Sequence, residues 1–266
     1  MQFSLWQVAV LAVLQGVTEF LPISSDGHLV VVRPLLFPAG SAPQDAMDLT
    51  IVLHMGTLGS ILVYYFRRTV RLLGEDRKVL WLLAVGTVPA VVLVLVCKTV
   101  LDQQFEPILQ NELLAGFMLP VTGLALLWAM RQNPGTREYR ELTWRDALVI
   151  GVCQATAILP GLSRSGTTIS AGLGLGMTRA SAAIYSFLLA IPALAGAGLY
   201  EAYSLVKHQQ PLSAQPTHLA IGATISFVVG LGSIWSLERL LLRGRLQWLA
   251  WYCIVLGAVV VVRQLM

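Results

Sequence analysis

Long apolar runs alternate with short polar segments along the whole of this chain. Six runs are long enough, or nearly so, to cross a bilayer as helices: 49–66, 80–97, 113–130, 182–200, 219–237 and 247–262. Because a helix rises 1.5 Å per residue, eighteen residues span about 27 Å, close to the hydrocarbon thickness of a membrane. Two further apolar regions, 3–37 and 147–178, are interrupted in the middle by Gly, Pro, Ser and ionisable residues. The pattern predicts an all-α integral membrane protein.

The composition agrees with this class. The 266 residues are 56% hydrophobic and 12% charged, whereas a soluble domain carries about 25% charged residues. We expect one polytopic membrane domain over residues 1–266 and no nucleic-acid partner, since membrane topology explains the net charge of +4. The first apolar stretch lacks a basic start and contains Gln7, Gln15 and Glu19, so we do not expect a cleaved signal peptide.

The basic loop residues predict the orientation. They gather in segments 67–78, 131–145 and 239–245, whereas the two loops between these contain only Lys98 and Lys207. Lys and Arg are enriched in cytoplasmic loops. We therefore place the three basic segments in the cytoplasm and both termini outside.

With this orientation, residue 49 starts outside, and residues 147 and 182 both start inside. Each interrupted region must therefore enter the membrane and return to the same side. This predicts two re-entrant helix pairs that enter from opposite faces. At a constant offset of 139, Gln15 matches Gln154, Ser24 matches Ser163 and Gly27 matches Gly166. Three identities are weak evidence alone, but opposed orientation with matched motifs is typical of an inverted-topology repeat with its site near the midplane. We expect repeat halves of roughly 1–130 and 131–266.

The first interrupted region contains a polar pair and a Ser/His motif. Gln15 and Glu19 lie on one helical face and offer hard oxygen ligands suited to Mg²⁺ or Ca²⁺; a hydrogen bond between packed helices is an equally good explanation. In Pro22–His28, Pro22 and Gly27 are expected to break the helix. Ser25 and His28 then suit nucleophilic catalysis, although a simple helix cap explains this motif alone.

The second interrupted region contains Pro160–Thr168. Arg164 lies between two serines in otherwise apolar sequence, just before an expected Gly-rich helix at 169–177. Freed amides, hydroxyls and a guanidinium at a helix N-terminus form an anion site. We therefore favour phosphate binding here. Outside these motifs, His54 either faces the site or caps a neighbour, and Tyr252 is interpreted as an interfacial anchor.

Together these motifs resemble those of the undecaprenyl-pyrophosphate phosphatase family, also called the bacitracin-resistance protein family. Its patterns are an acidic residue or Gln, three residues and Glu; Pro-x-Ser-Ser-x-Gly-His; and Pro-Gly-x-Ser-Arg-Ser-Gly-x-Thr. All three occur here in order, at Gln15–Glu19, Pro22–His28 and Pro160–Thr168. Gln15 stands where the family often has Glu, so one carboxylate fewer is available to a metal.

The resemblance implies a bacterial inner-membrane enzyme that hydrolyses a C55 polyprenyl pyrophosphate to the monophosphate and phosphate. This recycles the peptidoglycan lipid carrier and confers bacitracin resistance. It also implies a divalent cation, Mg²⁺ or Ca²⁺, and a site that opens to the outer face. Whether the protein forms a homodimer stays open. Carried over by motif, the implied catalytic residues are Ser25 as nucleophile, His28 as acid or base, Glu19 and Arg164. The implied metal ligands are Glu19 and Gln15, and the implied substrate-binding residues are Ser24, Gly27, Ser163, Arg164, Ser165, Gly166, Thr167 and Thr168.

Two alternatives are weighed against this. A polyprenyl-phosphate transporter or flippase would use the same fold without hydrolysis, but it needs no nucleophile. A membrane phosphatase of the phosphatidic-acid type needs a second His shortly after its Ser-Arg, and no His follows Arg164 before His208. Whether Ser25 or an activated water attacks phosphorus stays open.

Overall fold

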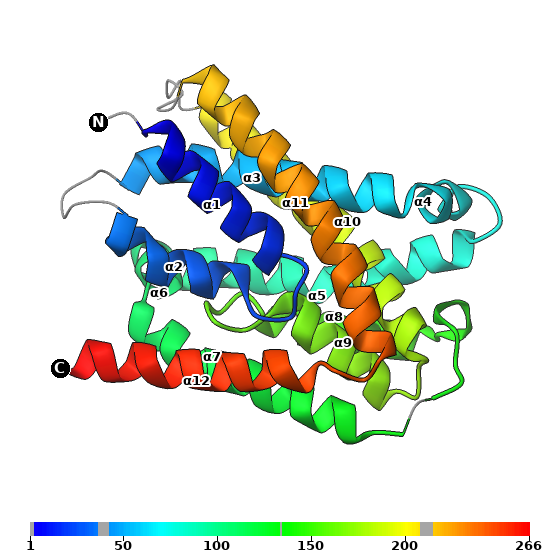
Figure 1. The fold of residues 1–266 in the computed structure, drawn as a ribbon. Coiled ribbons are helices and arrows are strands. Elements are labelled where there is room, and N and C mark those ends of the chain that lie inside the picture. The colour runs from blue at the N-terminus through cyan, green and yellow to red at the C-terminus, as the bar shows by residue number, and fades with distance from the viewer. Residues whose placement is uncertain (1–2, 37–42, 134, 208–214) are drawn as a thin grey trace.

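The computed structural model describes residues 3–36, 43–133, 135–207 and 215–266, which fold almost entirely into helices (Figure 1). No β-strand occurs in these ranges; Arg137 and Met177 form an isolated bridge. The α-helices in chain order are α1 (Leu5–Thr18), α2 (Ser25–Leu36), α3 (Pro43–Tyr64), α4 (Phe66–Leu72), α5 (Arg77–Leu101), α6 (Phe105–Leu109), α7 (Glu112–Arg131), α8 (Trp144–Thr156), α9 (Arg164–Gly174), α10 (Arg179–Lys207), α11 (Pro216–Leu242) and α12 (Gln247–Leu265). Short 3₁₀ turns, η1 (Asp102–Gln104) and η2 (Tyr139–Glu141), precede α6 and α8.

Five of the described helices are long and apolar enough to cross a membrane: α5, α7, α10, α11 and α12. The sixth expected span is α3. Its helix ends at Tyr64, and the chain bends by 83° into α4, so the apolar run 49–66 does not continue as one straight helix. The prediction of an all-α membrane protein is confirmed.

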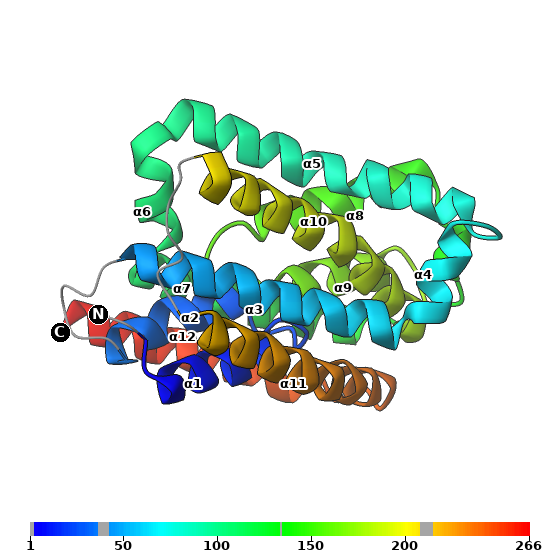
Figure 2. The ribbon, with the colours of Figure 1, turned by 90° about the horizontal axis from the view of Figure 1, so that it is seen from above.

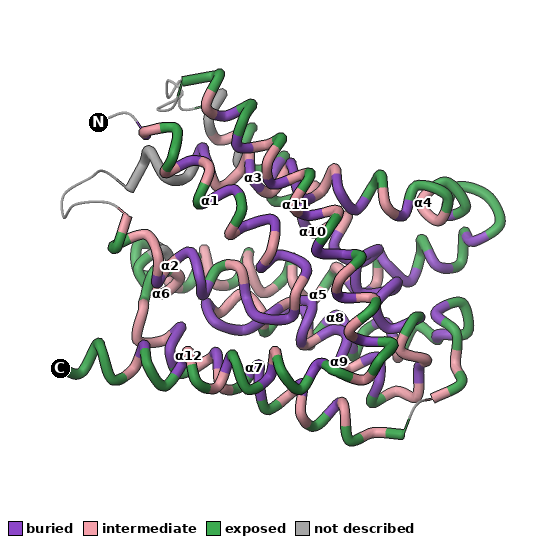
Figure 3. Tube along the Cα trace, viewed as in Figure 1, coloured by how far each residue is buried: buried purple, intermediate pink, exposed green. Residues whose placement is uncertain are grey.

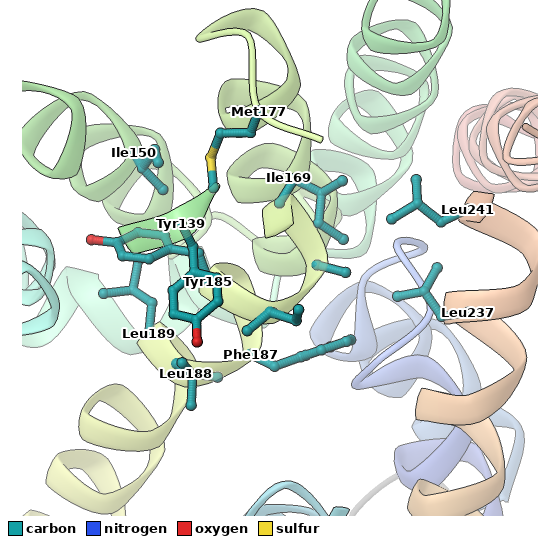
Figure 4. Packing of buried hydrophobic residues seen from close by; sticks show 14 of the residues in the cluster. Tyr139, Ile150, Ile169, Met177, Tyr185, Phe187, Leu188, Leu189, Leu237 and Leu241 are labelled. Atoms are coloured by element: carbon teal, nitrogen blue, oxygen red, sulfur yellow. The ribbon is translucent and has the colours of Figure 1, made fainter. Parts of the chain in front are cut away.

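Helix α10 lies at the centre of the bundle. Of its most apolar stretch, 61% is buried, against 22% for α5 and for α12. Figure 3 shows many exposed positions along α12, and the exposed side chains of both helices include large apolar ones such as Trp81, Val92, Trp251 and Val255. Tyr185, Phe187 and Leu188 of α10 pack with residues from α8, α9 and α11 (Figure 4). Such an exposed apolar exterior suits a lipid solvent rather than water.

Small residues bring α7 and α12 close together. A Cβ on Gly123 of α7 would lie 2.5 Å from the Ala250 carbonyl oxygen, and one on Gly257 of α12 would lie 2.6 Å from that of Gly116. Close backbone approach through small residues is how helices associate where lipid removes the hydrophobic driving force.

Each interrupted region forms two helices joined by a break: α1 and α2 around 19–24, and α8 and α9 around 157–163. Two local predictions are corrected. Gly27 lies in the first turn of α2 and does not break a helix. The Gly-rich helix begins at Arg164 rather than 169, because Ser163 caps it, and it ends before Gly176, whose φ of 79° is incompatible with a continuing helix.

The basic segments lie together at one end of the bundle, and both described termini lie at the other (Figures 1 and 2). At the basic end, Arg137 pairs with Asp146 at 2.7 Å, and Arg140 pairs with Asp76 at 2.8 Å. Partial burial acts to raise the pKa of Asp146, but hydrogen bonds from Arg137 and Thr143 outweigh it and hold that pKa below its usual value. The first pair holds segment 137–146 together, and the second ties it to the turn before α5.

Candidate active site

Glu19 is the centre of the polar cluster at the first break. Its side chain is 4% exposed and forms an ion pair with Arg164 at the start of α9. Its other carboxylate oxygen accepts hydrogen bonds from the Ser25 hydroxyl at 2.9 Å and the Gln15 amide at 3.0 Å. His54 of α3 lies on the same side, with Nε2 3.8 Å from that oxygen. Three segments distant in sequence, 15–25, His54 and Arg164, therefore meet at one carboxylate.

The two breaks share one local geometry. The Ser24 hydroxyl accepts from the Gly27 amide at 3.2 Å, and the Ser163 hydroxyl accepts from the Gly166 amide at 3.1 Å. Each serine thus caps the first turn of the following helix. Two of the three matched positions in the sequence, Ser24 with Ser163 and Gly27 with Gly166, therefore share a local structure, although Ser24 has a positive φ of 71° and Ser163 does not.

The breaks touch through two glycines. A Cβ on Gly27 would lie 2.8 Å from the Gly161 Cα, and Gly161 has a φ of 93° and packs against α7. Thr122 of α7 fixes this loop, because its hydroxyl donates to the Gly161 carbonyl at 2.8 Å and accepts from the Ser163 amide at 2.9 Å. Thr122 was missed from the sequence, since a single Thr in an apolar run carries no functional signal.

Replacing Gly161 with Ala should displace this loop. The added Cβ would meet the Ala115 carbonyl oxygen at 2.4 Å, and the positive φ disfavours Ala. We expect a loss of at least about 2 kcal/mol of stability, seen as a lower unfolding temperature in detergent. Gly232→Ala in α11 is the matched control, since its Cβ would meet nothing within 4 Å. Equal unfolding temperatures for the two variants would contradict this account of the loop.

The other polar residues of the second motif hold the loop and the first turn of α9. The hydroxyls of Ser163 and Ser165 lie 3.2 Å apart. Thr168 contacts Ser186 of α10 at 2.6 Å, hydroxyl to hydroxyl. Thr167 donates to the Arg164 carbonyl and lines a separate cavity of about 400 Å³ between α7, α8 and α9. Their contacts therefore position Arg164.

His28 is oriented by α12 rather than by Ser25. Its Nδ1 lies 2.7 Å from the Ser24 carbonyl oxygen, and its Nε2 lies 2.7 Å from the Tyr252 hydroxyl. Tyr252 thus contacts the site, which the interpretation as an interfacial anchor did not anticipate. His54, left open by the sequence, faces Glu19 and is held by its Nδ1 contact to the Thr50 carbonyl at 2.8 Å.

Three buried groups in or next to the two breaks lack a protein partner: Gln15 Oε1, Arg164 Nη1 and the amide of Gln154 in the last turn of α8. Buried polar atoms are normally hydrogen-bonded, so the unpaired atoms of Gln15 and Arg164 are available to a polar ligand. Among the described residues, no three His, Cys, Asp or Glu side chains gather as a metal cage. Mg²⁺ does not need one, because it binds one or two carboxylates together with waters and substrate phosphates. Glu19 and the unpaired Gln15 oxygen are donors of that kind, and it is the Gln15 nitrogen that faces Glu19 in this structure.

A buried ion pair, hydroxyls and imidazoles between broken helices define an integral membrane protein with a polar site inside an apolar bundle. The chain belongs to the family described as bacitracin resistance protein BacA, whose model matches residues 8–259. It is 44% identical to the undecaprenyl-diphosphatase of Rhodopirellula baltica, over 97% of this chain and 98% of the relative. The undecaprenyl-diphosphatases of Mycobacterium leprae and Pelotomaculum thermopropionicum are 39% and 37% identical, over 97% of this chain and 94% and 96% of theirs.

Proposed function

We propose that this protein is an undecaprenyl-diphosphatase, which releases phosphate from the lipid pyrophosphate, recycles the cell-wall lipid carrier and confers bacitracin resistance. Family membership and the names of full-length relatives support this. The observation that carries it is the Ser25 hydroxyl on the Glu19 carboxylate, with the Arg164 guanidinium on the opposite oxygen. A hydroxyl, a proton acceptor and a cation at one point are the parts of phosphoryl transfer.

Each residue of the cluster has its own role in the reaction. Glu19 takes the Ser25 proton as the hydroxyl oxygen attacks the terminal phosphorus. The bond from that phosphorus to the bridging oxygen breaks, and the lipid monophosphate leaves and is protonated. Water then hydrolyses the phosphoserine, giving inorganic phosphate and free Ser25. Arg164 binds phosphate oxygens through Nη1, which has no protein partner, and stabilises the charge that develops on them. His28 acts as acid or base at the leaving oxygen or the attacking water.

A divalent cation, Mg²⁺ or Ca²⁺, would be held by Glu19 and Gln15 and would neutralise pyrophosphate charge. Support comes from the Gln15 oxygen, which is buried and unpaired.

Exchanging Gln15 for Glu should preserve activity and lower the Mg²⁺ concentration needed for half-maximal rate, because a second carboxylate strengthens a Mg²⁺ site. A Mg²⁺ titration of phosphate release measures this, with Gln7→Glu in the outer part of α1 as the control. Complete loss of activity in a folded Gln15→Glu protein would contradict Gln15 as a ligand.

The fold that serves this function is an inverted repeat of two re-entrant helix pairs, with halves of roughly 1–130 and 131–266. Two observations support it: the matched caps at Ser24 and Ser163, and the approach of α1 and α8 to the centre from opposite ends (Figure 1). In a bacterial inner membrane, the basic end would be cytoplasmic and both termini outside. As part of the same proposal, the site opens to the outer face of that membrane.

A polyprenyl-phosphate flippase is the alternative function. The two functions can be distinguished in vesicles that contain the purified protein and carry the lipid pyrophosphate in one leaflet. An undecaprenyl-diphosphatase converts the accessible lipid to monophosphate and releases phosphate. A flippase moves the unaltered pyrophosphate to the other leaflet. Transfer of intact lipid without phosphate would overturn the proposal.

A further inference from the structure

Helix α12 contacts the first break through two adjacent residues of its second turn. Tyr252 reaches His28, and the Cys253 thiol lies 3.9 Å from the Pro22 carbonyl oxygen. No sequence motif connects α12 to this break, because 224 positions separate Tyr252 from His28. The last helix therefore completes the surroundings of an imidazole at the other end of the chain.

The contacts of His28 fix which nitrogen carries its proton. A carbonyl oxygen only accepts, so Nδ1, which lies 2.7 Å from the Ser24 carbonyl, must be the protonated nitrogen. In the neutral ring, Nε2 is then an acceptor, and the Tyr252 hydroxyl donates to it at 2.7 Å. The two rings also stack, with centroids 5.6 Å apart and planes 12° apart.

A phenol suits this position chemically. Its hydroxyl both donates and accepts, so Tyr252 can donate to neutral Nε2 and accept from the protonated form. Because Nδ1 stays bonded to the Ser24 carbonyl, the proton is transferred at Nε2, and the Tyr252 hydroxyl releases Nε2 during the transfer. An acid–base residue needs a partner that tolerates both states, since it gains and loses a proton in each cycle.

We propose that Tyr252 is a positioning residue for His28: its hydroxyl and stacked ring hold the imidazole in one orientation for proton transfer, while the Ser24 carbonyl sets the tautomer. The kinetic part of this inference rests on the proposed phosphatase function. The structural part, the hydrogen bond of the Tyr252 hydroxyl to Nε2 of His28, does not.

Replacing Tyr252 with Phe removes one oxygen and keeps the stacked ring. We expect kcat to fall about tenfold, a part of the 10²–10⁴-fold that a positioned acid or base contributes, with KM within about twofold of wild type. Tyr200→Phe is the matched control; Tyr200 is 54% exposed, and Lys98 lies over its ring rather than beside its hydroxyl. An unchanged kcat in Tyr252→Phe would overturn the proposal.

Nitrogen-15 NMR of histidine-labelled protein provides the second readout. The chain has four histidines, so the His28 signal is assigned by its loss in His28→Asn. At a pH where the ring is neutral, we expect the Nδ1–H tautomer in wild type and also in Tyr252→Phe, because the Ser24 carbonyl is retained. The Nε2 chemical shift should change in Tyr252→Phe, because Nε2 loses its hydrogen-bond donor. An Nε2–H tautomer in wild type, or an Nε2 shift that is the same in both proteins, would overturn the inference. This measurement needs no turnover, so it judges the contact even if the proposed reaction fails.

Discussion

Arg164→Ala should reduce kcat/KM for phosphate release by at least about 10³-fold, the effect expected when a cation that stabilises phosphoryl-transfer charge is removed. Arg164 is the first residue of α9 and reaches across to Glu19 from the other half of the chain. Removing it deletes the phosphate contact and leaves the buried Glu19 charge without its ion-pair partner. The second effect lowers stability as well, so turnover must be measured per folded molecule.

Arg137→Ala is the control for the loss of an arginine ion pair. Arg137 is paired with Asp146 at the basic end of the bundle, away from the two breaks. We expect a small loss of stability and near wild-type turnover per folded molecule. Arg164→Lys should fall between wild type and Arg164→Ala, since it keeps the charge but not the planar fork of donors. Equal activity of Arg164→Ala and Arg137→Ala would contradict the role of Arg164.

Ser25→Ala should also abolish phosphate release, while the protein stays folded. The substitution removes the hydrogen bond from the Ser25 hydroxyl to Glu19. Glu19 keeps its hydrogen bond from Gln15 and its ion pair with Arg164. A hydrogen bond to a charged group contributes about 1.5–3 kcal/mol. Hence thermal unfolding should shift modestly, whereas turnover should be lost with the nucleophile.

Acid quenching during turnover with a radiolabelled terminal phosphate tests the same assignment. We expect labelled phosphoserine at position 25 in wild type and none in Ser25→Ala. Ser233→Ala is the control, because Ser233 is a buried serine that donates only within α11. Near-normal turnover of Ser25→Ala would assign the attack to an activated water instead.

The spans and the three motifs could be predicted from the sequence because each depends on local pattern. Eighteen apolar residues predict a membrane helix whatever surrounds them, and the bend after Tyr64 was the exception. The pairing of Glu19 with Arg164 was not predictable from either motif alone. The topology argument predicted that the two breaks meet, but it did not say which residues would pair there.

The contacts from neighbouring helices could not be predicted. Thr122 and Tyr252 lie in runs whose composition is fully explained by membrane burial, and each acts through long-range hydrogen bonds, two for Thr122 and one for Tyr252. Ser25 and His28 were expected to act side by side, but in the structure each has a different partner. Helical spacing puts both residues in α2, yet Ser25 bonds to Glu19 and His28 to Tyr252, because tertiary partners decide among the orientations that spacing allows.

Phosphate release in detergent solution is the most direct test of the phosphatase function. Purified protein is mixed with undecaprenyl pyrophosphate, with Mg²⁺ or with EDTA, where no membrane separates two compartments and transport cannot mimic hydrolysis. We predict one inorganic phosphate per lipid monophosphate, dependent on Mg²⁺ and absent in Arg164→Ala. Folded protein that binds the lipid and releases no phosphate under either condition would contradict the account.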